Sequence, residues 1–161
     1  SNIANASWLF AWHYNFFGLS VLIMLTLLGL LIASYLRLNV NGASVSSAER
    51  WSVDIPFSVY LGWITVATVA NITSWLYSVE WTGMGIAPQT WAIIMIAVAS
   101  VVGLLMALTR KDAAYLFVLV WSFVGIAVKQ VSAPNVVTTT WIGAGLMLVL
   151  VVYSLMRRKT A

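Results

Sequence analysis

The chain has 161 residues, of which 62% are hydrophobic and 7% charged, and its mean hydropathy is +0.98. Soluble domains carry roughly 25% charged residues, so this composition excludes a water-soluble globular protein and predicts an integral membrane protein. The formal net charge of +4 is confined to short polar segments, and the chain has no cysteine. The sequence therefore supports neither a nucleic-acid partner nor a disulfide or thiolate metal site.

Five complete membrane spans are predicted, because roughly 20 apolar residues cross a bilayer as a helix and about five such helices fit this length. The predicted fold class is all-α, a polytopic membrane helical bundle with five full transmembrane helices and a partial N-terminal helix at residues 1–13. That first segment lacks an initiator Met and is too short to cross, so it is expected to end a helix of a longer protein. The predicted spans cover residues 16–38, 57–79, 89–108, 113–130 and 136–156.

Two of the connections carry specific predictions. Residues 39–53 are expected to form a polar loop, after which Asp54 and Pro56 are typical of a helix start. Residues 110–112 are so few that the third and fourth spans should form an antiparallel hairpin. Asp112 is then interpreted as the N-terminal cap of the fourth span.

Basic residues lie almost entirely on one side of the predicted bundle. Seven fall at one set of span ends, and only Lys129 falls at the other. Loops rich in Lys and Arg are retained in the cytoplasm, so the C-terminus is expected to be cytoplasmic and the protein to lie in a bacterial inner (plasma) membrane. Lys129 is interpreted as a side chain that reaches the membrane surface from the end of its span. The seven are Arg37, Arg50, Arg110, Lys111, Arg157, Arg158 and Lys159.

Residues 60–75, within the predicted span 57–79, are the most unusual stretch of the sequence. Trp63, Ala67 and Asn71 recur at a spacing of four residues, which places them on one side of a helix. An amide without a partner is costly inside a bilayer. Asn71 is therefore expected to meet a neighbouring helix, a water molecule or a ligand, and the sequence leaves these three open.

Two segments together resemble the translocator-protein family, TspO/MBR, whose bacterial members are called tryptophan-rich sensory proteins. The first is Asn5-Ala-Ser-Trp8 with the aromatic run that follows it. The second contains Tyr60, Trp63, Ala67 and Asn71, in register with a motif of the family's fifth helix. The resemblance implies a protein that binds, senses or carries a tetrapyrrole or a similar hydrophobic molecule inside a helical bundle. It implies ligand-binding roles for Trp8, Trp63, Ala67 and Asn71, and no cofactor beyond such a ligand.

The resemblance covers only the first half of the chain. We therefore expect residues 1–80 to be TspO/MBR-like helices and residues 81–161 to be an additional three-helix membrane extension. The alternative function is a non-catalytic accessory or structural subunit of a larger membrane complex. Its support is the small-residue ridge Ala99, Gly103 and Ala107, which would let another helix approach closely. The expected partners are the lipid bilayer, a hydrophobic small molecule, and either further copies of this chain in a homo-oligomer or a larger membrane complex.

The other candidate residues indicate neither catalysis nor ion coupling nor metal binding. No carboxylate lies within a predicted span, and no Ser/His/Asp set or Gly-rich phosphate loop occurs, so neither an enzyme nor an ion-coupled carrier is expected. His13 is the only histidine and is interpreted as a solvated interface residue, which leaves no metal site. Of the nine tryptophans, Trp8, Trp63 and Trp121 lie deepest, where they could serve helix packing or a ligand wall.

Overall fold

The computed structural model describes residues 2–42 and 45–157, and every regular element within those ranges is helical. Short helical turns lie between the longer helices, including a 3₁₀ turn at Gly83–Gly85. The order along the chain is α1 (Asn2–His13), α2 (Phe17–Arg37), α3 (Ser47–Glu49), a π-helical turn (Arg50–Asp54), α4 (Ile55–Ser78), α5 (Pro88–Thr109), α6 (Ala113–Lys129) and α7 (Pro134–Met156).

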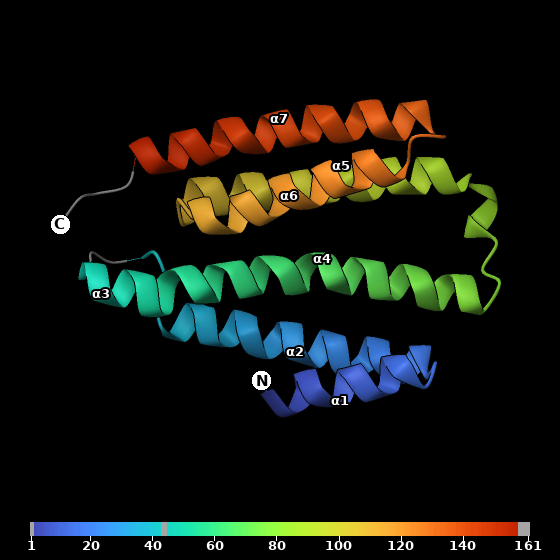
Figure 1. Ribbon diagram of the computed structural model, residues 1–161, viewed down its shortest axis with the longest axis horizontal. Coiled ribbons are helices and arrows are strands. Elements are labelled where there is room, and N and C mark those ends of the chain that lie inside the picture. The colour runs from blue at the N-terminus through green and yellow to red at the C-terminus, as the bar shows by residue number, and fades with distance from the viewer. Residues whose placement is uncertain (1, 43–44, 158–161) are drawn as a thin grey trace.

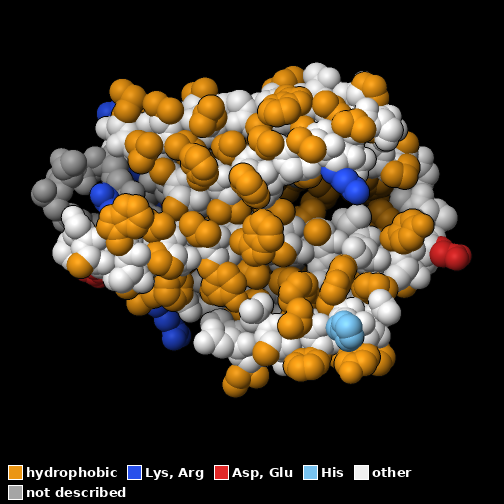
Figure 2. All heavy atoms as spheres, in the orientation of Figure 1, with side chains coloured by type: hydrophobic (Ala, Val, Ile, Leu, Met, Phe, Trp, Pro, Cys, Tyr) orange, Lys and Arg blue, Asp and Glu red, His pale blue; other side chains and the backbone are white. Residues whose placement is uncertain are grey.

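Four of these helical segments are long and apolar enough to cross a membrane: α2, the continuous run Ser47–Ser78, α5 and α7. The fifth apolar helix, α6, has 17 residues and lies at the short end of the range that can span. Hydrophobic side chains also cover much of the face in Figure 2, as expected of a surface that meets lipid. The prediction of an all-α membrane helical bundle is confirmed.

The helices form two sets of three (Figure 1). The first set contains α1, α2 and α4, with α2 packed between the other two. The second set contains α5, α6 and α7, with α7 packed against both α5 and α6. The two sets meet chiefly where α4 packs against α6. The chemistry of the α4–α6 contact therefore determines what lies between the halves of the bundle.

The polar loop expected at residues 39–53 is partly helical. Ser46 caps α3 by accepting a hydrogen bond from the Glu49 backbone N–H at 3.2 Å, and the helix then continues through the π-helical turn into α4. Asp54 is therefore buried inside a helix and does not begin one, contrary to the prediction. Ser46 and Glu49 have the spacing of a capping box, a stronger start signal than Asp54. The π turn lies where the missing N–H of Pro56 interrupts the helical ladder.

The small-residue ridge of α5 packs inside this chain. A methyl group built on Gly103 would lie 2.5 Å from Met147 Sδ and 2.9 Å from a Leu119 methyl. Ala107 is fully buried in the same core. The absence of a side chain at Gly103 thus lets α5 approach both α6 and α7, since contacts this close leave no room for a Cβ. The ridge is used for the fold of this chain and gives no support for a docking site for another subunit.

Candidate ligand-binding groove

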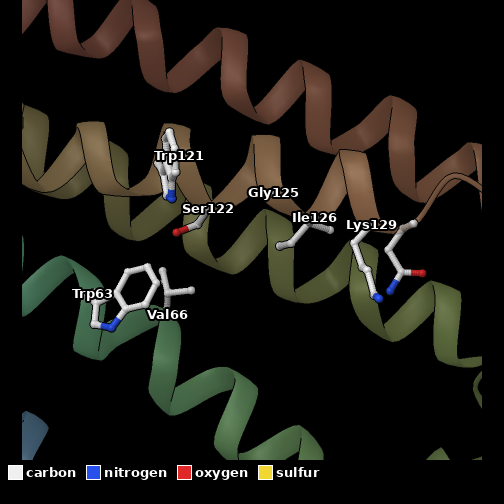
Figure 3. Close-up of a pocket in the computed structure, with 8 residues that line it drawn as sticks. Trp63, Val66, Trp121, Ser122, Gly125, Ile126 and Lys129 are labelled. Carbon is white, nitrogen blue, oxygen red and sulfur yellow. The ribbon is translucent and has the colours of Figure 1, made fainter.

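A groove runs along the contact between α4 and α6. It consists of two adjoining hollows with volumes of about 300 Å³ and about 580 Å³. Figure 2 shows a hollow between the two halves of the bundle, with a basic side chain at its edge. Trp63 of α4 and Trp121 of α6 line both hollows, and Figure 3 shows them on the two sides of the groove. These two indoles therefore mark the middle of the groove.

The lining of the groove differs between its ends. The end near the start of α6 is almost wholly apolar, whereas the end near the C-terminus of α6 adds polar groups. The apolar end is lined by Ile55, Val59, Ala113, Ala114, Phe117, Val118, Val151 and Leu155. The other end is lined by Val66, Ser122, Gly125, Ile126, Lys129 and Gln130.

Two glycines shape the contact between α4 and α6. A Cβ on Gly62 would lie 3.1 Å from Val118 Cβ, so α4 and α6 approach closely there. A Cβ on Gly125 would meet nothing within 4 Å, so the groove is open beside it. The tryptophans do not fill this space: Trp63 is 53% exposed and Trp121 is 71% exposed. Two broad aromatic surfaces consequently remain free along an apolar groove, an arrangement suited to a flat hydrophobic molecule.

The polar groups of the groove differ in their availability. The Ser122 hydroxyl donates to the Val118 backbone carbonyl at 2.8 Å, which satisfies its one donor within the helix. Lys129 is exposed, and among the residues that the structure describes it forms no ion pair. Figure 3 shows its side chain extending from α6 toward the space beside α4. Lys129 is therefore the cationic group of this end of the groove.

Asn71, predicted as a ligand-binding residue, lies outside the groove. It is 2% exposed, and its Nδ2 donates to Ser20 Oγ of α2 at 2.8 Å. The Ser20 hydroxyl in turn donates to Asn71 Oδ1 at 3.2 Å, and Ser20 is itself fully buried. Of the three partners that the sequence left open, the structure shows a neighbouring helix. This pair satisfies both polar groups and joins α2 to α4.

The remaining predicted site residues are also dispersed. Ala67 is half-buried and packs on the hydrophobic core. Trp8 is half-buried on α1, which packs on the side of α2 away from α6 (Figure 1). Its ring lies 6.1 Å from that of Trp12, and its Nε1 has no hydrogen-bond partner among the described residues. Of the four residues predicted to bind a ligand, only Trp63 lines the groove. Trp121 also lines it but was not among those four. Its depth within a span was the available signal.

A buried carboxylate, Asp112, links three helices at the end of the bundle where α6 begins. Asp112 Oδ2 accepts hydrogen bonds from Tyr35 Oη at 2.7 Å and Ser58 Oγ at 2.6 Å. Its Oδ1 accepts from the Tyr115 backbone N–H at 3.1 Å, which confirms Asp112 as the cap of α6. Asp112 is 1% exposed. The sequence thus predicted the capping role of Asp112. It could not predict the link to α2 and α4, because that link depends on residues far away in sequence.

The turn between the two halves is closed by a tryptophan pair. The rings of Trp81 and Trp91 lie 5.3 Å apart, and Trp91 Nε1 donates to the Gly83 carbonyl at 3.0 Å. Gly83 has a φ of 68°, a conformation in which glycine carries no steric cost. His13 is exposed at the end of α1, with its ring 5.2 Å from that of Tyr14. Within the described residues, no group of three or more His, Cys, Asp or Glu side chains could hold a metal.

A family model described as TSPO-like protein matches residues 1–153 of the chain. The match extends well beyond residue 80, through most of the region for which the motif resemblance offered no counterpart. The division of the chain at residue 80 stays a prediction. No curated protein and no solved structure matches the chain significantly.

Proposed function

Since the chain belongs to the TSPO-like protein family, we propose that this membrane protein binds, senses or carries a tetrapyrrole or similar flat hydrophobic molecule, without catalysis, in the α4–α6 groove. The observation that carries the proposal is the pair Trp63 and Trp121, both more than half exposed on opposite sides of an apolar groove.

The size and lining of the groove support this proposal. Small-molecule sites commonly have volumes of about 300–1,000 Å³, apolar and aromatic linings, and a few polar groups at fixed places. The two hollows, about 300 Å³ and about 580 Å³, share their tryptophans and form one elongated site. An indole offers a planar face that stacks on an aromatic ring, so a flat macrocycle or fused ring system would use both tryptophans at once.

The proposed route and orientation follow from the membrane setting. The groove is lined by exposed apolar residues such as Phe117 and Leu155, so a hydrophobic ligand would reach it from the lipid. Of the described basic residues, Arg37 ends α2, and Arg110 and Arg157 follow α5 and α7, while Lys129 ends α6 at the other side of the bundle. By the positive-inside rule, we propose a cytoplasmic C-terminus in a plasma membrane.

The test is a titration of the purified protein in detergent micelles with a dicarboxylic porphyrin, followed by porphyrin absorbance and by tryptophan fluorescence. We expect saturable binding that Trp63→Ala and Trp121→Ala each weaken about 5- to 20-fold, since each removes one stacking surface. Trp141→Ala is the matched control, because Trp141 is 52% exposed on α7 and does not line the groove. Absence of saturable binding by the unmodified protein, or equal weakening by all three variants, would refute the proposal.

The alternative role as an accessory subunit has no comparable observation behind it. It depended on the ridge that contains Gly103 and Ala107, and these residues contact α6 and α7 of the same chain. The proposal of a ligand-binding protein is therefore preferred.

A further inference from the structure

We infer that the ligand of the α4–α6 groove is an amphipathic anion, whose acidic group binds at Lys129 while its apolar body lies between Trp63 and Trp121. This inference rests on the proposed function, because it names the chemical class that the same groove would take. It adds a property that stacking alone does not require: the ligand carries negative charge, and carries it at one edge.

The position of Lys129 is the first argument. Lys129 is the last residue of α6 and lines the same hollow as Trp63 and Trp121 (Figure 3). Gln130, the next residue, lines that hollow too and supplies an amide that can donate a hydrogen bond. An ammonium and an amide therefore lie together at the end of an otherwise apolar groove. This combination is suited to a carboxylate whose carbon skeleton is apolar.

The charge distribution is the second argument. No ion pair neutralises Lys129 within the part of the chain that the structure describes. Glu80 follows α4 at this end of the bundle, but it does not line the groove. Asp112 is buried at the opposite end of α6, where it accepts hydrogen bonds from Tyr35 and Ser58. The cationic end of the groove is thus free to attract an anion, through an exposed charge pair of modest strength.

The shape of the groove orients the ligand. From Ala113 to Lys129, α6 extends along the groove over roughly 24 Å, given a helical rise of about 1.5 Å per residue. The far end is lined by apolar side chains such as Ile55, Phe117 and Leu155. No polar side chain lines that end, so a second acidic group there would have no hydrogen-bond partner within the groove. The groove therefore fits a molecule with its acidic groups on one edge and favours the orientation that places this edge at Lys129.

The experiment compares a dicarboxylic porphyrin with its dimethyl ester, which has the same ring without the charge, on the purified full chain. The variants are Lys129→Gln, Lys129→Arg and, as a control for net charge, Arg157→Gln at the opposite end of the bundle. We expect Lys129→Gln to weaken the diacid about fivefold and to leave the diester unchanged, the effect of one partly exposed charge pair. Lys129→Arg should retain diacid binding, and Arg157→Gln should bind both porphyrins as the unmodified protein does.

The outcomes separate this inference from the proposed function. If both porphyrins bind and Trp63→Ala weakens both, but Lys129→Gln weakens neither or weakens both equally, the anionic subsite is refuted and the groove stands. An equal loss of diacid binding in Arg157→Gln would refute it as well, because it would show a general effect of charge. If neither porphyrin binds the unmodified protein, the proposed function itself fails, and the inference fails with it.

Discussion

Helix α4 takes part in two contacts that differ in kind. Toward α2 it presents Asn71, which is buried and hydrogen-bonded to Ser20 at 2.8 Å. Toward α6 it presents Trp63, which remains 53% exposed beside a groove. Both residues belong to the motif that resembles the TspO/MBR family, yet only one of them is available to a ligand. A shared motif thus places residues on one helix, while the neighbouring helices decide which of them contacts protein and which contacts the groove.

The difference has a physical cause. An amide in a membrane helix must find a partner, and a small serine on α2 brings one within reach without separating the helices. The indoles of Trp63 and Trp121 line the space between α4 and α6 without filling it, and this space stays open beside Gly125. The closed contact stabilises the fold, and the open contact provides the site.

The largest expected effect concerns the closed contacts. Asp112→Ala would remove the acceptor of the Tyr35 and Ser58 hydroxyls and the cap of α6. We expect a loss of about 3 kcal/mol in the free energy of unfolding, because buried hydroxyls would lose their partner together with the cap. Thermal unfolding in detergent measures it, with Asp112→Asn as the milder variant. A wild-type melting temperature for Asp112→Ala would show that this cluster does not hold α2, α4 and α6 together.

The second effect tests whether Asn71 is structural. Asn71→Leu should lower the free energy of unfolding by about 1–2 kcal/mol, because Ser20 loses its partner in a buried position. Porphyrin affinity of the folded protein should stay within about twofold of the unmodified protein. Combining Asn71→Leu with Ser20→Ala should cost less than the sum of the two single changes, since both groups then become apolar. A selective loss of affinity in Asn71→Leu, without a loss of stability, would instead return Asn71 to the binding site.

The third prediction concerns the open contact between α4 and α6. A substitution there should change stability least and should act on binding. Gly125→Leu adds a side chain where a Cβ meets nothing within 4 Å, so it should fill the groove without straining the bundle. We expect porphyrin affinity to fall about tenfold and the melting temperature to change little. Gly145→Leu is the matched control, because Gly145 on α7 is equally open and does not line the groove. If the two variants bind porphyrin equally well, the site lies elsewhere.

The sequence by itself determined the elements of this protein. The predicted spans 89–108 and 113–130 correspond to α5 at Pro88–Thr109 and α6 at Ala113–Lys129. These boundaries follow from local chemistry: apolar runs of membrane length, a capping Asp112, and prolines at helix starts. The one misplaced start, at Asp54, overlooked a local signal that was equally present in the sequence, the capping pair Ser46 and Glu49.

Only the tertiary structure decided which helix faces meet. Helical spacing placed Trp63, Ala67 and Asn71 on one side, but it could not show that α2 and α6 divide that side between them. It could not show that Ser20 satisfies Asn71, nor that Trp121 lies across a groove from Trp63. In a bilayer every spanning helix is apolar, so periodicity carries little information about partners. Which helices become neighbours is decided by the packing of small against large side chains, and those side chains come from distant parts of the chain.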